Sequence, residues 1–115
     1  MKNKQIKNKK LKSLLPKIEN RIRTTFGSKV LKIILFGSYA RGDYNSESDV
    51  DIFVLINDNN LRKYRKDRVK IITEFLESNN LLLSIRIITA DNFSTYKDVI
   101  PFYQNVMSQG ITLYG

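Results

Sequence analysis

The stretch Gly37–Asp51 constrains the fold of this chain more than any other part of it. It lies between two apolar runs, Val30–Phe36 and Val50–Ile56, and both have the composition of buried β-strands. A glycine turn and a polar segment must therefore connect two strands that share one core. The pattern predicts a small sheet with a cluster of polar residues, from the Gly37–Asp51 segment, at one end.

Two pairs of residues in this stretch can carry chemistry. Gly37 lets the backbone approach a ligand closely, and Ser38 offers a hydroxyl and an N–H at the same turn. Asp49 and Asp51 alternate along a strand, so both carboxylates point to one face and suit a divalent cation. The Gly-Ser pair alone is common after a strand, and paired acids can also protect a sheet edge. In an otherwise apolar strand, however, two carboxylates need a compensating cation. Together the two pairs predict a site for a nucleoside triphosphate with Mg²⁺.

Composition narrows the chemistry that is available. The 115 residues contain neither cysteine nor histidine, which excludes disulfides, thiolate metal sites and histidine-based catalysis. Carboxylates, hydroxyls, Lys, Arg, Tyr and a hard metal bound through oxygen remain. No apolar run approaches the ~20 residues of a membrane span, and a secretory signal pattern is missing. A cytoplasmic protein without membrane contact is expected.

The net charge of +9 is concentrated at the N-terminus, where residues 1–23 hold nine Lys or Arg and one acid. Residues 1–10 are expected to form a frayed basic arm on a single domain that spans 1–115. A solvated helix face explains this charge, and a weak contact to RNA or an acidic partner is the alternative. A second basic run, with six Lys or Arg, covers residues 62–70.

Periodicity predicts the order helix, strand, strand, helix, strand, helix, helix. The first helix covers 11–26, starting near Ser13 or bending at Pro16, and ends at Gly27. The other expected elements are strands 30–36, 50–56 and 81–88, helices 61–78 and 101–109, a short helix after Thr89, and a last strand or packed tail at 111–114. The fold class is α/β (α+β), a small mixed sheet with helices packed mainly on one face.

These motifs resemble a known superfamily. Gly37-Ser38, Ala40-Arg41-Gly42 and Ser48–Ile52 are similar to the signature of the polymerase-β-like nucleotidyltransferases. The short chain is most similar to the minimal nucleotidyltransferases, the MntA-type antitoxins that are paired with HEPN-domain toxins. The close match covers residues 33–56, and residues 102–115 also resemble tails in this group.

The resemblance implies Mg²⁺-dependent transfer of AMP from ATP to a protein hydroxyl, with a HEPN-type RNase toxin as the partner. Gly37 and Ser38 would hold the β- and γ-phosphates, and Asp49 and Asp51 would ligate Mg²⁺ and, with Ser38, form the catalytic set.

Two further residues of the motif have open roles. Arg41 would neutralise phosphate charge, or it would pair with Asp43 or Glu47 and shape the segment. Ser48 is a candidate nucleotide contact, with capping of the turn before Asp49 as the alternative.

The third strand departs from the family pattern. Active members usually carry a third carboxylate there, but here Ser84 and Arg86 share one face by alternation and neither is acidic. If that face looks at Asp49 and Asp51, Arg86 lies about where the third carboxylate would be. An Arg at this place would compete with metal for the aspartates, and Asp91, just past the strand, is a poorly placed substitute. The alternative function is therefore a catalytically degenerate member that neutralises its partner by binding only.

Overall fold

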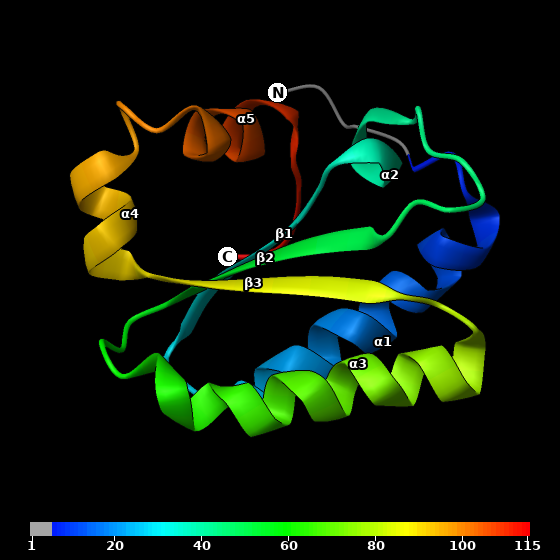
Figure 1. The fold of residues 1–115 in the computed structure, drawn as a ribbon, viewed down its shortest axis with the longest axis horizontal. Coiled ribbons are helices and arrows are strands. Elements are labelled where there is room, and N and C mark those ends of the chain that lie inside the picture. Colours follow the sequence, from blue (N-terminus) through cyan, green and yellow to red (C-terminus); the bar gives the residue numbers. More distant parts are fainter. Residues whose placement is uncertain (1–5) are drawn as a thin grey trace.

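The computed structural model describes residues 6–115, which form a four-stranded sheet and its surrounding helices (Figure 1). The elements are α1 (Lys9–Phe26), β1 (Val30–Phe36), α2 (Ser38–Arg41), β2 (Val50–Ile56), η1 (Leu61–Tyr64), α3 (Arg65–Asn79), β3 (Leu83–Thr89), α4 (Ala90–Tyr96), α5 (Pro101–Gln109) and β4 (Ile111–Tyr114). The first two strands begin and end where the sequence predicts. The third begins two residues later than expected, and the expected helix 61–78 starts with a 3₁₀ turn.

The sheet has the order β3-β2-β1-β4 and is mixed, as the sequence predicts. β1 pairs antiparallel with both β2 and β4, whereas β2 and β3 are parallel. The parallel pair is possible because η1 and α3 carry the chain back between the two strands. The order of the strands, which periodicity cannot supply, places β3 at one edge and β4 at the other.

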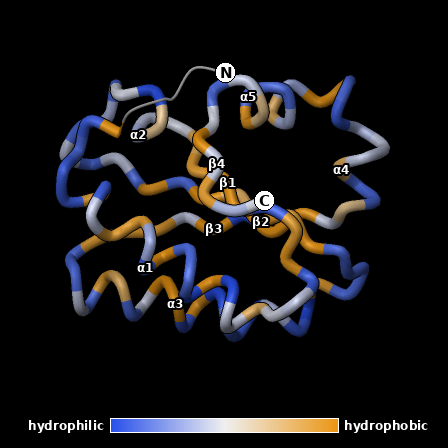
Figure 2. Tube along the Cα trace, turned by 180° about the vertical axis from the view of Figure 1, so that it is seen from behind, coloured by the Kyte–Doolittle hydropathy of each residue, from blue (hydrophilic) through white to orange (hydrophobic). Residues whose placement is uncertain are grey.

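Both faces of the sheet are covered. The long helices α1 and α3 lie on one face, above a core of strand residues that includes Ile33, Ile52 and Ile85. The shorter α4 and α5 cover the other face, where Phe53 contacts aromatic rings of both helices. Figure 2 shows the resulting pattern, with apolar strands in the middle and hydrophilic residues on the outer helices. Within residues 6–115, no helix has the length and apolar character needed to cross a membrane.

The expected start of the first helix is wrong by several residues. α1 begins at Lys9 because the side chain of Asn8 caps it, accepting a hydrogen bond from the N–H of Leu11 at 2.8 Å. Pro16 lies inside the helix, where it costs about 3 kcal/mol. A buried row compensates for that cost at roughly 1.5–3 kcal/mol per side chain: Leu11, Leu15, Ile18, Ile22 and Phe26. Part of the frayed arm expected at 1–10 lies outside the described residues, and Lys9 and Lys10 belong to α1.

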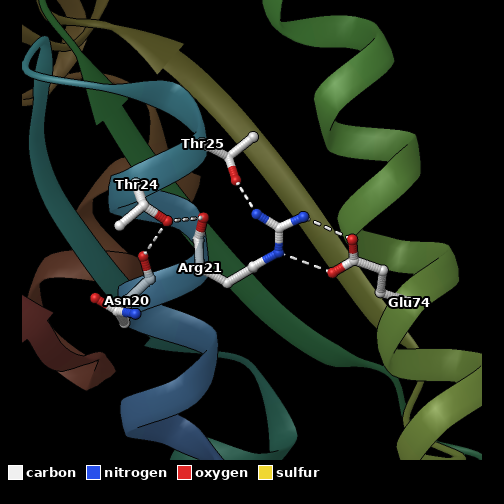
Figure 3. Close-up of polar contacts among 5 residues, drawn as sticks. All are labelled: Asn20, Arg21, Thr24, Thr25 and Glu74. Carbon is white, nitrogen blue, oxygen red and sulfur yellow. Dashed lines mark hydrogen bonds and ion pairs between the residues drawn. The ribbon is translucent and has the colours of Figure 1, made fainter.

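An ion pair links the two long helices (Figure 3). The guanidinium of Arg21 donates to both oxygens of Glu74, through Nε at 2.8 Å and through Nη2 at 2.6 Å. Thr25 accepts a third hydrogen bond from the same guanidinium, which holds it in the fork geometry. The hydrogen bonds from Arg21 lower the pKa of the Glu74 carboxyl.

This ion pair predicts a pH-dependent stability. A carboxyl whose pKa is lower in the folded state stabilises the fold above its unfolded pKa, and that contribution disappears as the pH falls through the folded pKa. Glu74→Gln should therefore be less stable than wild type in urea denaturation at pH 7, and the difference should shrink at pH 3. Glu77→Gln, an exposed change on the same helix, is the control. A Glu74→Gln difference that stays constant with pH would contradict this account.

Candidate functional site

The turn at Gly37 lies directly against Asp51. In the β1–β2 register, the last residue of β1, Phe36, is paired with Asp51, so the turn that follows β1 passes over the carboxylate. Gly37 has a φ of 75°, and a Cβ at this position would overlap Oδ2 of Asp51. Glycine is therefore required twice, for a left-handed backbone and for the close approach.

A pocket of about 350 Å³ opens beside this turn. Four of the candidate residues line it: Gly37, Ser38, Arg41 and Asp51. The opposite wall comes from α5, which contributes Phe102, Asn105 and Gln109 among others. Residues from three separate parts of the chain thus surround one space.

Asp51 is a half-buried carboxylate that is not neutralised by a basic side chain. Burial and the neighbouring charge of Asp49 raise its pKa, whereas Arg86 and Arg41 oppose that rise. Within residues 6–115 its carboxylate makes no hydrogen bond or ion pair. Two adjacent acids of which one is desolvated and without a partner are a donor set suited to a hard cation.

Asp49 and Ser48 do not line the pocket. Asp49 is exposed at the residue before β2, and its charge contributes to the raised pKa of Asp51. The hydroxyl of Ser48 accepts a hydrogen bond from the N–H of Asn45 at 2.9 Å, so it serves the turn that precedes the strand. Among the described residues, no group of three acids is arranged to hold a metal.

Arg41 borders the pocket and also pairs with Asp43. Its side chain lines the pocket, and its Nε donates to Asp43 at 3.2 Å. Both side chains are exposed, so this pair contributes little stability and leaves Arg41 free to move toward an anion. Tyr39 and Tyr44 stack with ring centroids 4.5 Å apart and brace the same segment.

Arg86 is on the pocket's side of the sheet but does not neutralise Asp51. In the β2–β3 register Ser84 is the neighbour of Asp51, and Arg86 is one step further along the same face. The Arg86 guanidinium lies over the ring of Phe102, 5.0 Å from its centroid. The ion pairs observed within residues 6–115 do not include it.

Asp91 cannot replace the missing third acid. It belongs to α4, beyond the far end of β3, while Asp51 is level with the start of that strand. The interpretation that it is poorly placed agrees with this geometry.

Sequence reasoning missed the contribution of α5. Phe102, Asn105 and Gln109 follow one another at spacings of three and four, so they share one side of the helix. That spacing was a readable signal, although it cannot show that the side in question faces Gly37. The antiparallel pairing of β4 with β1 brings α5 to this position.

Comparison with known proteins identifies the family. The family model of the nucleotidyltransferase domain matches residues 15–106. Two proteins of Methanocaldococcus jannaschii, both named "putative protein adenylyltransferase", are similar to this chain. One is 35% identical over 71 residues, covering 62% of this chain and 72% of the relative. The other is 32% identical over 95 residues, covering 83% and 89%.

Solved structures agree with these relatives. A chain of a toxin–antitoxin complex with AMP-PNP has a TM-score of 0.61 at 27% identity, covering 88% of this chain and 73% of that one. A chain of a MntA–HpeT toxin–antitoxin variant with two Asp-to-Glu exchanges has a TM-score of 0.61 at 25% identity, with the same coverage. Because the family match spans most of the chain, including the segment with the paired aspartates, this protein belongs to the nucleotidyltransferase family, as its resemblance to the minimal nucleotidyltransferases indicates.

Proposed function

We propose that this protein transfers AMP from ATP to a hydroxyl group of a partner protein in a Mg²⁺-dependent reaction. The observation that carries the proposal is the environment of Asp51. Its carboxylate is half-buried, has no partner within residues 6–115, and lines the pocket together with the Gly37-Ser38 turn. A site built in this way favours a ligand that combines phosphates with a cation.

The chain's own residues have distinct roles toward the nucleotide. Ser38 and the backbone at Gly37 hold the β- and γ-phosphates at the turn, and Arg41 offsets their charge. In the reaction, the acceptor oxygen forms a bond to the α-phosphorus and the bond to the bridging oxygen breaks. Pyrophosphate then leaves with the electron pair, and the hydroxyl releases its proton to solvent.

Asp49 and Asp51 are the residues that would hold the metal. Mg²⁺ is commonly bound through one or two carboxylates together with substrate phosphates, which fits a set of two acids. When bound, Mg²⁺ supplies positive charge against the charge that develops on the phosphate oxygens. Arg86 adds fixed positive charge on the same face, held in place by Phe102.

The acceptor that we propose is a HEPN-type toxin. This part of the proposal is supported by the motif resemblance to toxin-paired antitoxins and by the similarity to a chain of a toxin–antitoxin complex with AMP-PNP. The names of the curated relatives support a protein acceptor rather than a nucleic acid.

One observation favours a second candidate function, neutralisation by binding alone. The described residues lack the group of three acids that active members usually have, and Ser84 and Arg86 occupy the face of β3 beside Asp51. The two candidates differ in whether the wild-type protein transfers AMP to its partner at all.

Asp51→Asn tests the transfer directly. Labelled ATP, Mg²⁺ and the HEPN-type partner are incubated with each variant, and the label on the partner is measured. We expect transfer to fall at least about 100-fold, since the lost metal-held charge is worth several kcal/mol. Asp43→Asn, an acid of the same segment that does not line the pocket, should stay within about threefold of wild type. Transfer unaffected by Asp51→Asn would refute the proposed site, and no transfer by wild type would favour the binding-only function.

Arg86→Gln should change the pH dependence of metal binding. Because Arg86 opposes the rise in the pKa of Asp51, its removal raises that pKa further. The acid limb of Mg²⁺-dependent AMP-PNP binding, measured by calorimetry, should therefore move to higher pH. Lys66→Gln, which removes the same charge from an exposed position of α3, should leave the limb unchanged. An Arg86→Gln variant that binds Mg²⁺ more tightly at every pH would instead identify Arg86 as a competitor of the metal.

Gly37→Ala should lower both stability and nucleotide binding. Gly27 is a matched control because its φ is 89° and a Cβ there meets nothing within 4 Å. Gly27→Ala should cost about 1 kcal/mol of unfolding free energy from backbone strain alone. Gly37→Ala should cost at least about 1 kcal/mol more, because its methyl group must displace the Asp51 carboxylate. Equal losses in urea denaturation, with AMP-PNP binding intact in both variants, would show that the close approach is unimportant.

A further inference from the structure

A second pocket, of about 380 Å³, lies between the start of α3 and the end of β3. Three arginines line it, Arg62, Arg65 and Arg68, together with Asn59 and Asn60. Neither an acidic nor an aromatic side chain is among its lining residues. The pocket is therefore lined by positively charged guanidinium groups and neutral amides.

The three arginines have no acidic partner within residues 6–115, where the ion pairs involve other basic residues. None of the nearby acids lines this pocket. Asp58 is paired with Lys63 at 2.5 Å and accepts a hydrogen bond from Tyr64 at 2.7 Å. Asp67 lines a hollow on the side of α1 and contributes to the charge environment of Arg21. Asp91 lines a neighbouring hollow that shares Asn59 and Asn60 with this pocket.

The spacing of the arginines suits a ligand with linked phosphates. Residues three apart on a helix lie on the same side of it, so Arg65 and Arg68 can present two planar forks to neighbouring phosphate groups. Arg62, three residues before Arg65 on the preceding 3₁₀ turn, adds a third arginine to this group. Guanidinium groups bind phosphate oxygens in pairs, and the amides of Asn59 and Asn60 are further donors.

This pocket is separate from the site at Gly37–Asp51. Asp51 lies at the beginning of β2, whereas Asn59 and Asn60 follow its end, and a seven-residue strand spans roughly 20 Å. Figure 1 shows α2 and the start of α3 at opposite ends of the sheet. A single triphosphate cannot occupy both places.

We propose that Arg62, Arg65 and Arg68 form a second phosphate-binding site, which takes a ligand with at least two linked phosphates. The ligand is either the backbone of single-stranded RNA or a free polyphosphate. With no aromatic residue in the lining, base stacking does not contribute, and RNA binding is independent of sequence. The site is distinct from the basic N-terminal arm, and it does not depend on the proposed transfer of AMP.

The test measures binding of two probes, a labelled U12 oligonucleotide by fluorescence anisotropy and tripolyphosphate by calorimetry. Both are run in EDTA, so that metal-dependent binding at Asp49 and Asp51 does not contribute. The variant Arg62→Gln/Arg65→Gln/Arg68→Gln is compared with Lys9→Gln/Lys10→Gln/Lys12→Gln, which removes the same charge from exposed positions of α1. Thermal unfolding checks that both variants fold.

We expect the arginine variant to bind at least tenfold more weakly to one of the probes at 50 mM salt, and the lysine variant to change by less than threefold. If RNA is the ligand, the slope of log K against log salt should become shallower by about 2, since each contact to a single strand contributes about 0.7. Arg62→Lys/Arg65→Lys/Arg68→Lys should lie between wild type and the Gln variant, because it keeps the charge but loses the fork.

The two probes distinguish the sources of phosphate. Loss of U12 binding identifies RNA, and loss of tripolyphosphate binding alone identifies a free polyphosphate. If the arginine variant loses no more than the lysine variant with either probe, the charge of the protein as a whole explains the binding, and the proposed site is refuted.

Discussion

The antiparallel pairing of β1 with β2 is the interaction on which the candidate site depends. It places Phe36 beside Asp51, so the turn that leaves β1 must cross the carboxylate of the neighbouring strand. Gly37 permits that crossing, and the short helix α2 then positions Ser38 and Arg41 around the same acid. A shift of one residue in this register would move Asp51 to the face covered by α1 and α3, among buried aliphatic side chains.

The two faces of the sheet differ in the size of their apolar cores and in their contact with the pocket. The face under α1 and α3 holds the larger apolar core, and the Arg21–Glu74 pair joins its helices. The other face has a smaller, largely aromatic core around Phe53. Its outer rings, including Phe102, form part of the pocket wall. The same face thus combines an aromatic core with ligand contact, because α5 packs on the core and also lines the pocket beside Asp51.

Arg86 illustrates how a charge can be present without neutralising its neighbour. Alternation along β3 predicts that Ser84 and Arg86 share one face, and the β2–β3 register makes it the face of Asp51. What alternation cannot predict is the direction of a long side chain. Stacking on Phe102 holds the guanidinium away from the carboxylate, so its charge acts on Asp51 through space rather than through an ion pair. The carboxylate of Asp51 is therefore not occupied by Arg86 and remains available to bind a metal ion.

Local pattern by itself determined the two central strands, the Gly-Ser turn and the paired aspartates, because period-two alternation and glycine's backbone freedom act within a few residues. It also indicated the family through the spacing of those residues. Only the tertiary structure decided that α5 supplies the opposite wall of the pocket and that Arg62, Arg65 and Arg68 line a second one. Those arrangements depend on the order of the strands and on how the helices pack across the sheet. Both are set by contacts between residues far apart in the chain. The passage of α1 through Pro16 has the same kind of cause, since burial of its apolar row against the sheet outweighs the cost of the proline. Its start at Lys9, in contrast, is set locally by the cap of Asn8.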